Sequence, residues 1–235
     1  MISEVQLLDR IAFLDQFPDK YFDWAIDDPP YFSGPERRGF YGRDESTTKV
    51  KRVHYEKTPE WVVPGKDYFD LLISKSKNQI IWGVNYYSYI FQPGRIVWDK
   101  VNSNSTFSDC EIAYCSSHDS TRLFRYMWNG MLQGLNIKEG HIQIGNKKLN
   151  EKRIHPTQKP VNLYKWLYLN YAKPGQRIVD CHVGSGSHRI AAHEYGCDFY
   201  GCELSPVHFA GQQQRFEEFL KQQMLFTPSQ MSLLR

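Results

Sequence analysis

Three short apolar runs in this chain each end at a polar or glycine-rich turn, and helix-like segments separate them. The runs cover residues 22–27, 177–180 and 199–203. Runs of this length bounded by turn formers are typical of buried strands. Strands that alternate with helices pack as a mostly parallel sheet with helices on both faces. The sequence therefore predicts an α/β fold, and its 235 residues are enough for one such domain.

The remaining elements follow from the same local patterns. Short apolar runs predict further strands, and apolar residues at helical spacing predict helices. The further strands are expected at residues 79–83, 95–98, 111–115, 124–127 and 141–144, and the helices over 7–14, 67–75, 156–171, 206–221 and around Ala191. We expect a single domain over residues 1–235, with an inserted basic loop at 33–60 and a small target-recognition segment at about 118–152.

Basic residues concentrate in those two segments. Residues 33–57 contain seven Lys and Arg against four Asp and Glu, and residues 118–160 contain eight against three. Because the whole chain carries only +3, the rest of it is net acidic. Two basic segments on an acidic body favour a polyanionic partner, although solvated surface loops would have the same composition. The candidate phosphate contacts are Arg37, Arg38, Lys49, Lys51, Arg52, Arg122, Arg125, Lys147 and Lys148.

The cysteines and the hydropathy pattern exclude several classes of protein. Five cysteines with no C-x-x-C pair argue against a disulfide framework and against a zinc site. An odd set of this kind fits a reducing compartment. The chain starts without a basic and apolar leader, and no apolar stretch approaches the length of a membrane span. We therefore expect a cytoplasmic protein without a metal ion or a membrane partner.

The motif Asp28-Pro29-Pro30-Tyr31 follows the strand expected at residues 22–27. Ligands of open α/β sheets bind outside the carboxyl ends of the strands, so reactive groups are expected there. Two prolines fix the backbone and remove two N–H donors, which leaves carbonyls free to face a ligand. A carboxylate and a carbonyl accept both hydrogens of an amino group, and an aromatic ring can stack beside it. These four residues are the predicted catalytic motif, and a plain strand-terminating turn is the alternative.

A second motif, Asp180 to Ser187, ends the strand at 177–180 and opens a helix. Its glycines allow the backbone to approach a nucleotide, and a helix N-terminus supplies free N–H groups. Glu203 ends the next strand, where an acidic residue suits the two hydroxyls of a ribose. A lone G-x-G is equally compatible with a tight turn. The candidate nucleoside-binding residues are Asp180, His182, Gly184, Ser185, Gly186, Ser187 and Glu203.

A third motif spans residues 153–160 and introduces the helix expected from 156. Thr157 is a candidate helix cap, and Lys159 near a helix start suits a carboxylate ligand. An ordinary helix entry is the alternative, and the candidate cofactor-binding residues of this motif are His155, Thr157 and Lys159.

Together the three motifs resemble those of the DNA amino-methyltransferases, which modify adenine N6 or cytosine N4. Residues 28–31 match the catalytic D-P-P-Y of that family, residues 155–160 match its H-P-T-Q-K-P, and residues 180–187 look like its D-P-F-x-G-S-G-T loop. The catalytic motif precedes the cofactor loop, which is the circularly permuted order of the β class. The resemblance implies a Rossmann-like methyltransferase fold, S-adenosyl-L-methionine as cofactor, DNA as partner and a homodimer.

The resemblance also implies a mechanism. A flipped-out base would present its amino group to Asp28 and to the Pro29 carbonyl, with Tyr31 stacked on the ring. An aspartate before the two prolines favours adenine over cytosine in this family. Cytosine N4 uses the same chemistry and is the nearer alternative.

The chain departs from the family at Cys181 and His182, where the family usually has Pro and Phe. The Phe position packs near the adenosine of the cofactor, and histidine is smaller and polar. A DNA-binding module with impaired cofactor binding is therefore the second alternative. A nicotinamide oxidoreductase is disfavoured because Arg189 stands where the G-x-G-x-x-G motif requires its last glycine.

Overall fold

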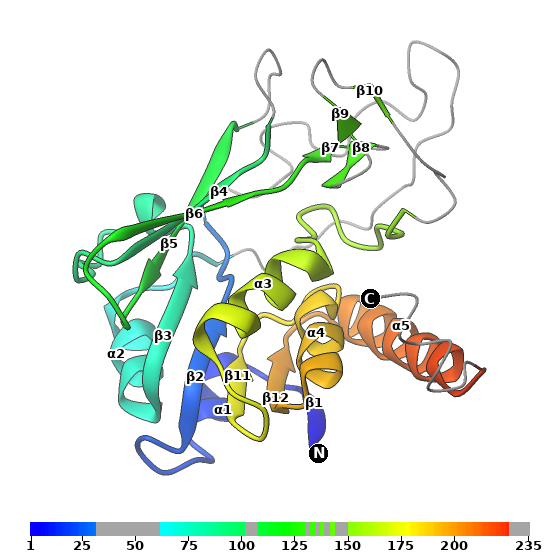
Figure 1. The fold of residues 1–235 in the computed structure, drawn as a ribbon. Coiled ribbons are helices and arrows are strands. Elements are labelled where there is room, and N and C mark those ends of the chain that lie inside the picture. The colour runs from blue at the N-terminus through cyan, green and yellow to red at the C-terminus, as the bar shows by residue number, and fades with distance from the viewer. Residues whose placement is uncertain are drawn as a thin grey trace.

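The computed structural model describes residues 1–31, 62–101, 108–129, 132–134, 137–138, 142–143 and 150–225. Its centre is an eight-stranded sheet (Figure 1) of β1 (Ser3–Leu7), β2 (Phe22–Asp27), β3 (Ser76–Trp82), β4 (Arg95–Asp99), β5 (Cys110–Cys115), β6 (Thr121–Arg125), β11 (Arg177–Asp180) and β12 (Asp198–Glu203). Two separate antiparallel pairs are formed by β7 (Trp128–Asn129) with β8 (Leu132–Gln133), and by β9 (Ile137–Lys138) with β10 (Ile142–Gln143). The helices are α1 (Arg10–Leu14), α2 (Lys66–Lys75), α3 (Val161–Tyr171), α4 (Ser187–Tyr195) and α5 (Pro206–Leu225), with a single 3₁₀ turn η2 (Val84–Tyr86) after β3.

The strand order of the large sheet is β1-β12-β11-β2-β3-β5-β4-β6. Of these eight described strands, only β5 runs antiparallel to its neighbours, so the predicted mostly parallel sheet is confirmed. The chain passes from β11 through α4 to β12, but from β2 through α2 to β3, on the other side. Adjacent strands β11 and β2 thus form a topological switch point, where open α/β sheets bind their ligands.

Helices cover both faces of the sheet (Figure 1), as the sequence predicts. On one face α1 and α2 bury Phe13, Phe69 and Leu72. On the other face α3 and α4 pack together and bury Leu167 and Ala191. Burying a large apolar side chain contributes about 1.5–3 kcal/mol. The two layers therefore fix the carboxyl ends of β2 and β11 from both sides.

The third helix begins later than the sequence predicts. It starts at Val161 rather than at Pro156, because Pro160 takes an extended conformation and is the N-cap residue. Helical geometry is also disfavoured for the residue before a proline, which here is Lys159. Residues 155–158 instead form a turn that a hydrogen bond closes, from the Gln158 N–H to the His155 carbonyl at 3.2 Å. Thr157 is therefore not the cap of this helix.

Part of the segment that the sequence groups with DNA recognition belongs to the main sheet. Strand β6 pairs in parallel with β4, from Thr121 opposite Arg95 to Arg125 opposite Asp99. The sequence places this strand at 124–127, a few residues too late. Among the helices of the described ranges, none has the length and apolarity that crossing a membrane requires.

Candidate active site

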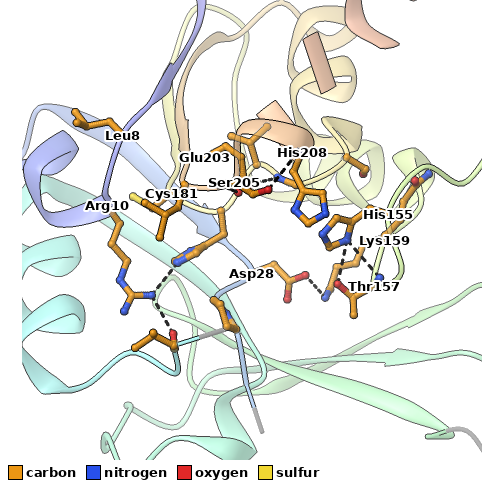
Figure 2. A pocket seen from close by; sticks show the side chains of 18 of the residues that line it. Leu8, Arg10, Asp28, His155, Thr157, Lys159, Cys181, Glu203, Ser205 and His208 are labelled. Atoms are coloured by element: carbon orange, nitrogen blue, oxygen red, sulfur yellow. Dashed lines mark hydrogen bonds and ion pairs between the residues drawn. The ribbon is translucent and has the colours of Figure 1, made fainter. Parts of the chain in front are cut away.

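The switch point opens into a pocket of about 240 Å³ (Figure 2). Its walls come from the turn between β1 and α1, the residues after β2, the 155–159 turn, the β11–α4 loop and the β12–α5 turn. The lining residues include members of all three sequence motifs, which are Asp28, Pro30, His155, Thr157, Lys159, His182, Gly184, Ser185 and Glu203. Segments far apart in the sequence therefore meet in one cavity.

The backbone of the β11–α4 loop depends on its glycines. Gly184 has a φ of 52° and Gly186 has a φ of 73°, both in the left-handed region that side chains other than glycine rarely adopt. A Cβ atom on Gly184 would lie 3.9 Å from the His155 ring, inside the pocket wall. A Cβ atom on Gly186 would lie 3.2 Å from the Gln212 side chain. Gly184 thus keeps the pocket open, whereas Gly186 allows close packing of α5.

Glu203 connects this loop to the next turn. One carboxylate oxygen accepts the Gly184 N–H at 2.9 Å, and the other accepts the Ser205 N–H at 2.9 Å. Each carboxylate oxygen can accept a second hydrogen bond. The fixed carboxylate is therefore suited to a ligand with two adjacent hydroxyl groups.

Three residues predicted for the cofactor lie outside the pocket lining. Asp180 accepts the His182 N–H at 2.9 Å and contacts His188 Nδ1 at 2.8 Å, so its carboxylate is occupied by the protein. Burial and the nearby Asp27 carboxylate raise the pKa of Asp180 well above its usual value. Gly186 shapes the loop, and Ser187 donates to Glu151 at 3.1 Å. These three residues maintain the loop without facing the cavity.

His182 lies between two charged side chains. Its Nδ1 atom is 3.0 Å from both carboxylate oxygens of Asp27, and its Nε2 atom is 3.1 Å from a guanidinium nitrogen of Arg10. Because a guanidinium only donates, Nε2 is the acceptor and the ring proton on Nδ1 is donated to Asp27. Arg10 also lies over the Tyr68 ring, 4.9 Å from its centre. His182, which stands where the family usually has phenylalanine, is therefore held by hydrogen bonds to Asp27 and Arg10.

Asp28 lines the pocket and points toward Lys159 (Figure 2). Its Oδ2 atom is 2.5 Å from the Lys159 ammonium, which also lies 2.9 Å from the Glu111 carboxylate. Its Oδ1 atom is buried and has no hydrogen-bond partner within the described part of the chain. A buried carboxylate oxygen in this state is unfavourable unless a ligand supplies a donor.

The charges around Asp28 act on it in opposite directions. Burial raises the pKa of Asp28, the Lys159 ammonium lowers it and Glu111 raises it, and the net direction is upward. Burial also raises the pKa of Glu111, but Lys159 and Lys100 hold that pKa at about 2. Lys159 was expected to bind a cofactor carboxylate. Lys159 does line the pocket, and within the described residues two protein carboxylates share its charge.

The other residues of the catalytic motif also have partners. The sequence predicts that the Pro29 carbonyl is free to face a ligand. In the structure it already accepts a hydrogen bond from the Tyr87 hydroxyl at 2.9 Å. A carbonyl oxygen has a second lone pair, which leaves room for one more donor. The Tyr31 ring stacks on Tyr86, with the ring centres 4.8 Å apart and the planes 6° from parallel. The Tyr31 ring is thus held by a second aromatic ring.

The 155–159 turn places two imidazoles side by side (Figure 2). The His155 and His208 ring centres are 4.2 Å apart, edge to face, and the Thr157 hydroxyl lies 3.2 Å from His155 Nδ1. Burial, together with the neighbouring His208 and Lys159, lowers the pKa of His155 to about 3. His155 is therefore neutral at physiological pH.

The site residues that were not predicted from the sequence include Arg10, Tyr86, Glu111 and His208. Glu111 is an acidic residue in an otherwise apolar strand, and Arg10 follows a strand end. The sequence shows both of these positions, but it does not show which side chains Glu111 and Arg10 contact in the fold.

The predicted phosphate contacts are only partly visible. Arg122 and Arg125 are exposed on β6, and Arg125 pairs with Asp99 at 2.8 Å. Arg37, Arg38, Lys49, Lys51, Arg52, Lys147 and Lys148 lie outside the described residues. Phe124 and Trp128, which lie among basic residues in the sequence, are buried in the core.

The pocket fits S-adenosyl-L-methionine. It offers a carboxylate suited to the ribose hydroxyls at Glu203 and an open glycine backbone at Gly184. The catalytic strand β2 precedes the cofactor strand β11 in the chain but lies next to it in the sheet. Fold and site together define an S-adenosylmethionine-dependent amino-methyltransferase of permuted Rossmann-like architecture.

Comparison with known proteins identifies the family. A family model described as DNA methylase, of the N6/N4 methyltransferases, matches residues 47–213, which is more than half of the chain. The chain therefore belongs to the N6/N4 DNA methylases, which transfer a methyl group from S-adenosylmethionine to DNA. It is 23% identical over 249 residues to the type II methyltransferase M.HinfI of Haemophilus influenzae, covering 89% of this chain and 67% of that protein.

Two solved structures share the fold. The structure of M1.HpyAVI with S-adenosylmethionine matches with a TM-score of 0.51 at 19% identity, covering 92% of this chain and all (100%) of the other. The cytosine-N4-specific PvuII methyltransferase matches with a TM-score of 0.54 at 14% identity, covering 92% of this chain and 86% of the other. These similarities support the fold, and at this identity they say nothing about the base.

Proposed function

We propose that this protein methylates the N6 amino group of adenine in duplex DNA, with Asp28 as the residue that grips the amine. The observation that carries the proposal is the Oδ1 atom of Asp28, a pocket-lining residue, which is buried and has no hydrogen-bond partner among the described residues. A base amine supplies the N–H donor that this oxygen lacks.

Two acceptors would orient the amine. Asp28 Oδ1 accepts one N–H, and the second lone pair of the Pro29 carbonyl accepts the other. The nitrogen lone pair, otherwise delocalised into the base, is then directed away from both acceptors. As the new N–C bond forms, positive charge develops on the nitrogen and the Asp28 carboxylate stabilises it. The nitrogen finally gives up one proton, which passes through the carboxylate to solvent.

The cofactor would lie across the β11–α4 loop. Glu203 would hold the ribose hydroxyls, Gly184 and Ser185 would line its path, and His182 would form the adenosine wall. His155, beside Gly184, and Thr157 would line the same cavity. When bound, S-adenosylmethionine supplies an electrophilic methyl group and leaves as a neutral thioether.

The amine is inaccessible inside a stacked duplex, so the base must be flipped out, at a cost of a few kcal/mol. Stacking on Tyr31 would recover about 1–3 kcal/mol of that cost. Arg122 and Arg125, exposed on β6, are proposed to contact phosphates together with Arg37, Arg38, Lys49, Lys51, Arg52, Lys147 and Lys148. Binding should therefore weaken steeply as salt increases.

Adenine is preferred over cytosine because an aspartate precedes the two prolines. The test is transfer of a labelled methyl group to duplex DNA, followed by digestion to nucleosides and chromatography. We expect the label in N6-methyladenine. Label in N4-methylcytosine would show that the target base is cytosine and not adenine. Unlabelled DNA, together with no S-adenosylmethionine binding in calorimetry, would favour a DNA-binding module.

We further propose that the protein acts in the cytoplasm as a homodimer. The dimer rests on resemblance to the β class alone. Sedimentation of the purified protein tests it, and a monomer at micromolar concentration would contradict it.

A further inference from the structure

Four charged side chains form an alternating line that ends in the pocket. Asp28 contacts Lys159 at 2.5 Å, Lys159 contacts Glu111 at 2.9 Å, and Glu111 also contacts Lys100. The side chains come from the loop after β2, the 155–159 turn, β5 and the end of β4. Because they arise from four separate parts of the fold, the line is a product of tertiary structure.

Lys159 is the central member of this line. Its side chain is 3% exposed, and those of Asp28 and Glu111 are 16% and 15% exposed. A buried ammonium is unfavourable unless it is paired and hydrogen-bonded. Burial lowers the pKa of Lys159, but Asp28 and Glu111 raise it above the ordinary value. Lys159 is therefore a permanent positive charge beside Asp28.

We propose that Lys159 and Glu111 are positioning residues for Asp28. Lys159 binds Oδ2 and keeps the carboxylate charged, so that Oδ1 is presented to the substrate amine. Glu111 holds the Lys159 ammonium in place. Its negative charge opposes the lowering of the Asp28 pKa by Lys159. The inference rests on the role proposed above for Asp28.

The protonation state of Asp28 decides whether it can act. A protonated carboxyl group at this place would lose the negative charge that stabilises the developing cation. Methyl transfer should therefore fall on the acid side of its pH profile. The groups that face Asp28 are Lys159, Glu111, Asp27 and the hydroxyls of Tyr31, Tyr87 and Tyr164. Burial raises the pKa of each of these three tyrosines, so they stay neutral across this pH range.

The acid limb of the pH profile is the range in which methyl transfer falls as Asp28 becomes protonated. Removing charges of opposite sign should move this limb in opposite directions. Lys159→Met removes a positive charge next to Asp28, so the limb should move to higher pH by about 1–3 pH units. Glu111→Gln removes a negative charge and keeps an oxygen acceptor, so the limb should move to lower pH. Lys159→Arg keeps the charge and should keep the limb near its original position.

The experiment measures the pH profile of single-turnover methyl transfer for the full-length protein and these variants. Lys165→Met is the control, because Lys165 of α3 pairs with Glu194 of α4 at 2.8 Å, outside this line of charges. Its profile should match that of the unaltered protein. Thermal melting establishes that each variant is folded.

A second readout does not depend on activity. The carboxyl carbon of Asp28, labelled with ¹³C and assigned with Asp28→Asn, should titrate at higher pH in Lys159→Met and at lower pH in Glu111→Gln. Unaltered protein that methylates no DNA would overturn the proposed function. Active protein in which both variants leave the limb and the carbon titration unmoved, or move them the same way, would overturn this inference alone.

Discussion

Gly83 offers a direct test of how Tyr31 is held. Gly83 follows β3 and has a φ of 75°, and a Cβ atom built there would lie 2.5 Å from Tyr31 Cδ1 and 3.0 Å from Cγ and Cε1. Contacts of this length do not occur, so Gly83→Ala must displace the Tyr31 ring. The backbone of Gly83 thus sets the position of the ring that is proposed to stack on the flipped base.

Gly175→Ala is the matched control. Gly175 has a φ of 82°, but a Cβ atom there would meet nothing within 4 Å. Both substitutions have the same left-handed backbone cost of about 1–2 kcal/mol, offset by about 0.4–1 kcal/mol from the less flexible unfolded chain. Gly83→Ala should lose a further ~0.5–1.5 kcal/mol, the value of an aromatic pair, because the stack of Tyr31 on Tyr86 is disturbed.

The measurements are thermal unfolding and methyl transfer. For a domain of this size, 1 kcal/mol corresponds to about 2–4 °C, so Gly83→Ala should melt about 1–6 °C below Gly175→Ala. Gly83→Ala should also lose most of its methyl transfer, whereas Gly175→Ala should keep it. Equal melting temperatures and full activity in both variants would refute the packing of Tyr31 against Gly83.

Three further predictions concern individual side chains. Tyr31→Phe should keep most activity, whereas Tyr31→Ala should lose about 5- to 150-fold in transfer from duplex DNA, the equivalent of 1–3 kcal/mol of stacking; normal turnover by the alanine variant would contradict the stacking role. His155 has a folded-state pKa of about 3, below its unfolded value, so the unfolded state binds the extra proton and stability should decline as pH falls from about 6.5 toward 3. Chemical denaturation at several pH values should show a smaller decline for His155→Gln, and an identical decline would count against a buried neutral imidazole. His182→Phe, although it restores the family's residue, should lower the free energy of unfolding by about 1–3 kcal/mol because Asp27 and Arg10 each lose a partner; an unchanged denaturation midpoint would show that this hydrogen-bonded chain contributes nothing.

The fold and the place of the site were predictable because their signals are local. Apolar runs that end at Asp28, Asp180 and Glu203 predict strand ends, and parallel strands bring those ends to one edge of the sheet. The start of α3 at Val161 also has a local cause, which is the extended conformation of the N-cap residue Pro160.

Partners across the fold could not be predicted in the same way. The pattern of residues 155–160 indicates that Lys159 lies near a ligand, but its charge is taken up by Asp28 and Glu111, which are distant in the sequence. Periodicity likewise does not reveal that β5 runs antiparallel between β3 and β4. The direction of a strand and the partner of a buried charge depend on long-range packing.

The most direct test of the account compares Asp28→Ala with the unaltered protein in two assays on the same preparation. Calorimetry measures S-adenosylmethionine binding, and labelled methyl transfer to duplex DNA measures the reaction. We predict that the variant binds the cofactor with unchanged affinity and transfers no methyl group, because Oδ1 of Asp28 holds the amine and not the cofactor. A variant that still methylates DNA, or one that loses cofactor binding to the same extent as transfer, would contradict the role assigned to this carboxylate.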